Sequence, residues 1–263
     1  MSHELPENNN VENTHNAHEK LLNEQWEKTQ NNKVIEALKS GQDLSEILES
    51  LSGFKESFHE LKNLDCSDGR ICSGSKQGLA GVGILLSSEE RLILIEAIKN
   101  KGLTITGHEN CGAAAIAFPG PDSDNHGYDN AKLLAEETGN TYKEIHSDEF
   151  LCQIHNERSI VVEGTGRFDS ANWKEFPPHF INSAPSLGLP DSYVQKEIVA
   201  LAGIALAGHG FTKRFDAANP FYIIISASNQ EQLQHLTTVS EEAVKEFGDR
   251  VQVKGFVAPE TQE

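Results

Sequence analysis

The segment Leu103-Thr104-Ile105-Thr106-Gly107-His108-Glu109-Asn110-Cys111-Gly112-Ala113-Ala114-Ala115 decides the fold class of this chain. Residues 103–106 predict a short strand, and the run from Cys111 to Phe118 predicts the start of a helix. Gly112 and the three alanines after it allow that helix to approach a sheet closely. A strand that passes through a short polar turn into a helix is typical of α/β proteins.

Strands and helices continue to alternate on both sides of this segment. The sequence predicts strands that end near Leu64 or cover 79–86, 159–163, 221–226 and 251–257. It predicts helices over 87–100, 131–145, 193–207 and 230–247. The segment 119–130 predicts a loop, 176–189 is rich in proline and serine, and no internal repeat is evident. This alternation predicts a largely parallel central sheet flanked by helices on both faces.

The chain divides into three parts by composition. Residues 1–15 are rich in Asn, Glu and His and predict a disordered tail. Residues 16–52 carry apolar side chains at helical spacing and predict an N-terminal helical arm, interrupted at Gly41. Residues 53–263 predict a single α/β domain. The arm packs either on a partner subunit or on its own domain, and the sequence leaves both arrangements open.

Composition and charge exclude several classes of partner. The chain has 263 residues, of which 37% are hydrophobic, as expected for a soluble protein with a substantial core. Its net charge of −18 argues against a nucleic-acid surface and against docking on anionic membranes. No signal peptide or membrane-spanning apolar run is evident, so the expected location is cytoplasmic. In that reducing compartment, the four cysteines favour metal binding or catalysis over disulfides.

Two of these cysteines and one histidine form a candidate metal site. His108 lies at the carboxyl end of a predicted strand, where ligand sites of α/β sheets form, and Cys111 lies in the first turn of the next helix. The positive end of that helix favours the thiolate form of Cys111. Cys66 also follows a predicted strand, so the sheet can bring it beside the other two. Two sulfurs and one imidazole suit zinc and leave a fourth position open.

A charged pair follows Cys66 in the segment Cys66-Ser67-Asp68-Gly69-Arg70. Asp68 can reach the open metal position or the water in it, and Arg70 points the same way if the segment is extended. An arginine–carboxylate pair is bidentate, so Arg70 can hold Asp68 off the metal and aim it at the water. The alternative is a closed structural site in which Asp68 or Cys72 is the fourth ligand.

These segments resemble those of the β-class carbonic anhydrases, which carry a C-x-D-x-R segment after the first core strand and an H-x-x-C-G segment after a later one. The resemblance covers about Leu64 to Ala115. It implies that Cys66, His108 and Cys111 bind Zn²⁺ and that Asp68 and Arg70 form the catalytic pair. It also implies a β-carbonic-anhydrase-like fold and a homodimer or higher homo-oligomer, with the helical arm over the neighbouring subunit.

The chain departs from that family at several positions. The family usually has serine at the position of Gly69, and Leu79 to Ser87 lacks the family's Arg-Asn-Ala-Gly-type segment. His108 follows Cys66 by 42 residues, which is shorter than the usual spacing. Residues 159–169 resemble the family's next strand only weakly, and the chain beyond Asp169 matches nothing in it.

The function that the resemblance implies is the reversible hydration of CO2 to bicarbonate by a zinc-bound hydroxide. Asp68 would orient the hydroxide, Arg70 would keep Asp68 ionised, and 79–86 with Ala113 would line the CO2 pocket. Proton-shuttle candidates are the following histidines: His126, His146, His155 and His209. The alternatives are a hydrolase that acts on CS2 or COS and a non-catalytic descendant that keeps zinc in a closed site.

Overall fold

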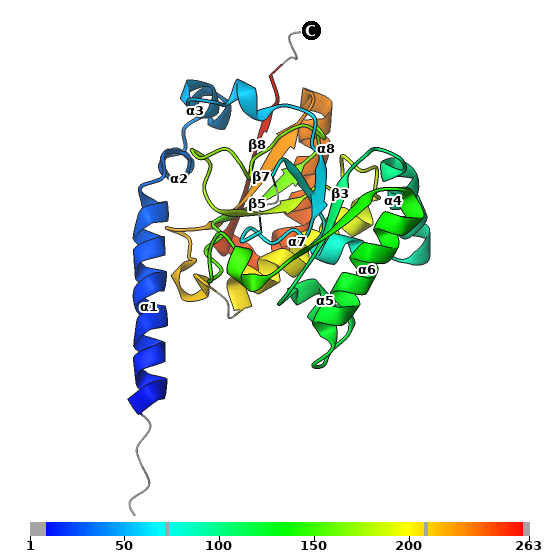
Figure 1. Cartoon of the computed structure of the whole chain (residues 1–263). Coiled ribbons are helices and arrows are strands. Elements are labelled where there is room, and N and C mark those ends of the chain that lie inside the picture. The colour runs from blue at the N-terminus through cyan, green and yellow to red at the C-terminus, as the bar shows by residue number, and fades with distance from the viewer. Residues whose placement is uncertain (1–8, 72–73, 208–209, 260–263) are drawn as a thin grey trace, which may run out of the picture.

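The computed structural model describes residues 9–71, 74–207 and 210–259. Over these residues the chain forms two four-stranded sheets, and every strand pairing within them is parallel (Figure 1). The first sheet contains β1 (Asn63–Asp65), β2 (Lys76–Gly78), β3 (Thr104–His108) and β4 (Thr141–Ile145). The second contains β5 (Ser159–Glu163), β6 (His179–Asn182), β7 (Phe221–Ala227) and β8 (Val251–Val257).

Helices flank both sheets, which confirms the α/β class. On the first sheet, α6 (Ser123–Thr138) packs against β3 and β4 and also contacts α4 (Ser88–Ile98). On the second sheet, α7 (Asp191–Ala207) contacts β5 and β6, and α8 (Gln230–Val244) contacts β7 and β8. None of the described helices is both long enough and apolar enough to span a bilayer.

The two sheets repeat one topology, although the sequence shows no repeat. Their strand orders are β2-β1-β3-β4 and β6-β5-β7-β8, so each half of the chain places its first two strands and its last two in the same arrangement. In each half a helix joins the second strand to the third, α4 in one and α7 in the other. The prediction of one central sheet is therefore corrected to two sheets of equal strand number.

The edge strands of the two sheets, β2 and β6, lie against each other. Gly78 in β2 accepts a hydrogen bond on its carbonyl oxygen from the Ser183 amide at 2.8 Å. A side chain at Gly78 would meet the Ile181 side chain and carbonyl at 2.7 Å, so the close approach of the edges requires glycine here. The Ile181 amide also donates to the Ser67 carbonyl at 3.0 Å, which attaches the segment after β1 to the second half.

Most of the predicted elements are present. The predicted strands at 159–163, 221–226 and 251–257 correspond to β5, β7 and β8, whose central members β5 and β7 are buried along their whole length. Continuous apolar strands of this kind are typical of a parallel sheet covered on both faces. Helix α4 begins as predicted, because Ser87 and Glu90 form a capping box.

Three predicted elements are wrong, namely the strand over 79–86, the loop over 119–130 and the helix over 131–145, and one strand is missed. Residues 79–86 do not form a strand, because Gly81 and Val82 adopt the left-handed conformation within a 3-10 turn. Helix α6 begins at Ser123, inside the predicted loop 119–130, and ends at Thr138, because Gly139 caps it with a positive φ. Residues 141–145, predicted as helix, form β4. Strand β6 lies inside the proline- and serine-rich segment, where no strand is predicted.

The N-terminal arm consists of α1 (Asn9–Gln30), α2 (Lys33–Ser40) and α3 (Leu44–Ser50). Helix α1 covers 9–15, which the sequence assigns to a disordered tail, so that prediction is wrong over these residues; residues 1–8 lie outside the described residues. The predicted break at Gly41 is confirmed, because this glycine ends α2 with a φ of 72°.

The arm packs on its own chain. Apolar side chains of α2 and α3, among them Val34 and Leu48, form one buried cluster with Val161, Tyr222 and Phe256 of the second sheet. Earlier in the chain, the Trp26 ring of α1 lies against the Phe211 ring, with 5.0 Å between the ring centroids. The helices α2 and α3 thus cover the second sheet on the face that includes Tyr222 and Phe256.

This packing predicts that the arm contributes to the stability of the single chain. Leu48 is fully buried, so Leu48→Ala should lower the free energy of unfolding by about 2–5 kcal/mol, through lost apolar contact and the cavity left behind. Urea denaturation measures the change. Glu49→Ala, on the exposed side of the same helix, is the control and should change it by less than about 0.5 kcal/mol. Equal effects of the two substitutions would contradict this packing.

Candidate metal centre

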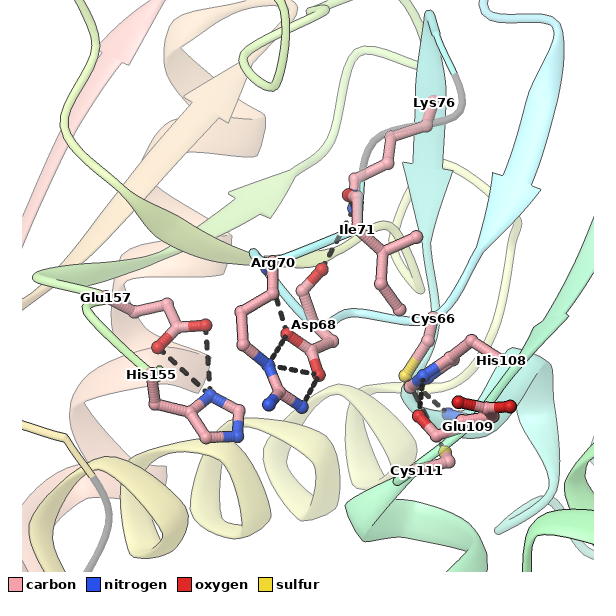
Figure 2. Close-up of polar contacts among 11 residues, drawn as sticks. Cys66, Asp68, Arg70, Ile71, Lys76, His108, Glu109, Cys111, His155 and Glu157 are labelled. Carbon is pink, nitrogen blue, oxygen red and sulfur yellow. Dashed lines mark hydrogen bonds and ion pairs between the residues drawn. The ribbon is translucent and has the colours of Figure 1, made fainter. Parts of the chain in front are cut away.

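The structure brings Cys66, His108 and Cys111 together at the carboxyl ends of β1 and β3 (Figure 2). All three are buried, and their ligand atoms lie within 4.8 Å of one another. The two sulfurs are 4.0 Å apart. Two metal–sulfur bonds of about 2.3 Å at a tetrahedral angle would place sulfurs about 3.8 Å apart, so the spacing fits a shared metal ion.

The imidazole of His108 is oriented as a metal ligand. Its Nδ1 donates a hydrogen bond to the Glu109 carbonyl oxygen at 2.7 Å, which fixes the ring and leaves Nε2 as the ligand atom. Nε2 is buried and has no hydrogen-bond partner among the described residues. A buried nitrogen without a partner is costly, and a metal ion at this point would satisfy it.

The two thiols differ in their pKa. The Cys111 thiol and the charge of His108 lower the pKa of Cys66 well below its usual range, although burial opposes them, and the Gly81 amide lies 3.2 Å from the Cys66 sulfur. The hydrogen bond to Cys66 and burial raise the pKa of Cys111. The amides of the helix that follows Cys111 lower its pKa, as predicted, but the hydrogen bond to Cys66 and burial raise it by more. The Gly81 amide and the charge of His108 therefore both favour a thiolate at Cys66.

Asp68 and Arg70 form the bidentate pair that the sequence suggests. The Nη2 of Arg70 donates to Oδ2 of Asp68 at 2.6 Å, and its Nε lies 3.0 Å from Oδ1. Burial alone would raise the pKa of Asp68, but the hydrogen bonds and charge of Arg70 hold it well below its usual range. Asp68 is therefore an ionised carboxylate with a fixed orientation beside the metal cluster.

Two further buried residues hold this segment and were not predicted from the sequence. Glu197 of α7 accepts hydrogen bonds from Ser67 Oγ and from the Ala80 amide, both at 2.5 Å, and burial raises its pKa to about 8. Lys76 donates from Nζ to the carbonyls of Asp68 and Ile71. A single carboxylate within the strongly apolar helix 193–207 is the signal that could have identified Glu197.

A cavity of about 390 Å³ lies beside Cys66 and the charged pair. Cys66, Asp68 and Arg70 lie in its wall, and the remaining wall is mostly apolar. The predicted lining segment 79–86 contributes only Ala80 and Leu85. Much of the apolar wall comes instead from the second half of the chain, which supplies Phe180, Ala200, Leu201 and Ile204.

Contact with the second half also explains Gly69, one of the departures from the β-class carbonic anhydrase pattern. A Cβ at this position would collide with the carbonyl oxygen of His179 and lie 3.0 Å from Cγ of Glu157. The segment after β1 thus passes so close to β6 that a serine does not fit.

The predicted proton-shuttle histidines lie in different places. His155 lines the cavity, whereas His146 is exposed and lies beside Glu109. His126 is also exposed and stacks on Phe118. His209, and with it Cys72 as a possible fourth ligand, lies outside the described residues.

Among the described residues of the second half, the carboxyl ends of the strands carry no equivalent cluster of candidate metal ligands. The segment that follows β5 is Gly164-Thr165-Gly166-Arg167-Phe168, without cysteine or aspartate, and β7 runs into Ser228 and Asn229. The buried carboxylate of Glu163 accepts hydrogen bonds from the amides of Thr165 and Gly166 at this end of the sheet. The candidate centre described above therefore belongs to the first half alone.

Comparisons with known proteins add nothing to this geometry. No protein-family model matches the chain, and no curated protein or solved structure matches it.

The close approach at Gly69 leads to a testable prediction. Gly69→Ala should destabilise the fold by about 1–3 kcal/mol, because the new methyl group displaces the His179 backbone. The control is Gly203→Ala in α7, where a Cβ meets nothing within 4 Å and helix propensity favours alanine by about 0.5–1 kcal/mol. Urea unfolding of both variants measures the difference. A neutral Gly69→Ala would show that the two halves are not in tight contact here.

Proposed function

We propose that this protein is a zinc enzyme, similar to the β-class carbonic anhydrases, that hydrates CO2 reversibly to bicarbonate. The observation that carries this proposal is a buried Cys-His-Cys cluster whose Cys66 lies in the wall of a cavity together with the bidentate Asp68–Arg70 pair. A structural zinc site needs four protein ligands and no cavity, whereas a catalytic one keeps a position open toward substrate.

The donor set favours zinc over other divalent ions. Cys66, Cys111 and Nε2 of His108 offer two sulfurs and one nitrogen, the soft and borderline ligands that zinc prefers, at a spacing that fits tetrahedral coordination. When bound, zinc supplies a Lewis acid that lowers the pKa of a water molecule to about 7. The thiols must remain reduced to bind it, which supports a cytoplasmic location.

Asp68 and Arg70 have separate roles in the proposed reaction. An ionised Asp68 accepts a hydrogen bond from the attacking water and so orients its lone pair toward the carbon of CO2. Arg70 keeps Asp68 ionised and occupies both of its oxygens, which holds the carboxylate in one position. The apolar wall formed by Phe180, Leu201 and Ile204 suits an uncharged substrate and excludes competing water from that side.

The cavity also has room for a second candidate substrate. Its volume of about 390 Å³ accommodates a linear molecule bulkier than CO2, and its wall is mostly apolar. CS2 and COS are larger than CO2 and would undergo hydrolysis by the same attack. Rates with CO2, COS and CS2 on the zinc-loaded protein distinguish these functions.

The metal proposal predicts about one zinc per chain in the purified protein, measured by elemental analysis. Cys66→Ser and Cys111→Ser should each lose most of the metal, because each removes one of three ligands. Cys152→Ser is the matched control, since this cysteine lines a separate cavity, and it should keep the wild-type zinc content. Retention of zinc in Cys66→Ser would contradict the assigned ligand set.

If Asp68 orients the attacking water and does not bind the metal, replacing it should lower turnover and leave the zinc content unchanged. Asp68→Asn should keep zinc but lower the rate of CO2 hydration in stopped-flow measurements by about 100-fold or more. The reason is that a neutral amide accepts a weaker hydrogen bond from the attacking water than a carboxylate does. The exposed Asp122→Asn is the control and should be unaffected. Loss of zinc in Asp68→Asn would identify Asp68 as a fourth ligand. A zinc-loaded wild type that turns over none of the three substrates would indicate a non-catalytic binding protein.

A further inference from the structure

Glu197 is a buried carboxyl group that the second half of the chain places against the segment that carries Cys66. It lies in α7, an otherwise strongly apolar helix, and only 1% of the residue is exposed. Its Oε1 accepts hydrogen bonds from Ser67 Oγ and from the Ala80 amide, each at 2.5 Å. Burying a carboxyl group is costly, so a role beyond the packing of α7 is expected for it.

The two donors to Glu197 are each one residue away from the groups that surround the Cys66 sulfur. Ser67 directly follows Cys66 in the chain. Ala80 directly precedes Gly81, whose amide lies 3.2 Å from Sγ of Cys66. One oxygen of Glu197 therefore joins the backbone of this candidate ligand to the turn whose amide donates to its sulfur. A shift of either donor changes the distance between that amide and the sulfur.

The turn that carries the Gly81 amide is held from both halves of the chain. Gly81 adopts the left-handed conformation, with a φ of 54°, and its peptide bond begins at Ala80. On one side, Nδ2 of Asn130 in α6 donates to the carbonyl oxygens of Gly81 and Val82 at 3.1 and 3.2 Å. On the other side, Glu197 binds the Ala80 amide. Glu197 thus holds the end of the turn at which the amide meets the sulfur.

Glu197 acts on these groups as a hydrogen-bond acceptor and not through its charge. Burial raises its pKa to about 8, so the carboxyl group is largely neutral at pH 7. Its second oxygen, Oε2, is buried and has no hydrogen-bond partner among the described residues. Both of the hydrogen bonds described above end on Oε1, and the oxygen of a glutamine at this position can accept the same two.

We propose that Glu197 is a positioning residue of the metal centre, which holds the Gly81 amide against the Cys66 sulfur and so tunes Cys66 as a zinc ligand. The inference rests on the proposed function in that zinc binds at Cys66, but it requires no turnover. An N–H donor withdraws charge from a thiolate and fixes the direction of its lone pairs. Groups that orient a ligand in this way typically contribute about 10–100-fold to metal affinity.

The first experiment measures the zinc affinity of the full chain by competition with a chelating dye. Glu197→Leu should weaken zinc binding about 10–100-fold, because Ser67 Oγ and the Ala80 amide then lose their acceptor. Glu197→Gln should stay within about three-fold of wild type, since its amide oxygen accepts both bonds. Ser67→Ala removes one of the two bonds, and its zinc affinity should fall between those of the two Glu197 variants.

Ile198→Val is the matched control for a general loss of stability. Ile198 is the next residue of α7, is fully buried, and belongs to the large apolar cluster. The substitution lowers stability by leaving a small cavity, which urea denaturation measures, and it should leave the zinc affinity at the wild-type value. An equal loss of zinc affinity in Ile198→Val and Glu197→Leu would show that Glu197 acts through stability alone and would overturn the proposal.

The second experiment reports on the sulfur itself. In protein loaded with Co²⁺ in place of zinc, the thiolate-to-cobalt charge-transfer absorption depends on the electron density of the sulfur ligands. Loss of the N–H donor raises that density at Cys66, so the band should move to longer wavelength in Glu197→Leu and, by less, in Ser67→Ala. Glu197→Gln and Ile198→Val should keep the wild-type spectrum. An unchanged band in folded Glu197→Leu would contradict the proposed role.

The outcomes separate this inference from the proposed function. A wild-type protein that binds no zinc would overturn both. A zinc-loaded wild type without turnover would contradict the proposed function alone, because zinc affinity and the cobalt spectrum still decide the role of Glu197. Unchanged zinc affinity in folded Glu197→Leu, or an equal loss in Glu197→Gln, would overturn the role of Glu197 alone. Should Glu197→Leu fail to fold, Ser67→Ala measured against Ile198→Val decides the question in the same way.

Discussion

The clamping of residues 66–71 between the two sheets is the constraint on which the candidate site depends. On one side this segment follows β1 and is tied to α7 through the bond from Ser67 to Glu197. On the other side the Ile181 amide binds the Ser67 carbonyl, and β6 passes too close to Gly69 for any side chain there. Because both sides are fixed, the cysteine and the charged pair in this segment have defined positions relative to His108.

The sequence predicts the site better than it predicts the fold around it. The three metal-ligand candidates and the charged pair follow strands closely, and strand ends in a parallel sheet meet at one edge, so local sequence is enough to place Cys66 near His108. The strands β5, β7 and β8 can also be predicted from the sequence, because buried parallel strands form continuous apolar runs. In contrast, β4 is largely exposed, and its polar sequence reads as part of the preceding helix.

Long-range contacts account for what the sequence does not reveal. Nothing local marks the left-handed turn at Gly81 and Val82 as a binding loop, yet the amide of Gly81 contacts the Cys66 sulfur. The repeated strand order is equally hidden, since the sequence shows no internal repeat and the two halves share a pattern of connections. The nearness of His155 to Asp68, within 4.8 Å, depends on how the two halves pack together, which no spacing along the chain encodes.

The joining of the two halves in one chain has a consequence for how the cavity can vary. In a symmetric dimer of identical subunits, any substitution in the wall of a cavity between them occurs in both subunits and so affects both sites. Here the first half carries the metal ligands, while Phe180, Leu201 and Ile204 of the second half form much of the apolar wall. A substitution in that wall therefore alters the shape of the cavity without being copied into the metal-binding half. Size selectivity and metal chemistry can thus change independently within one polypeptide.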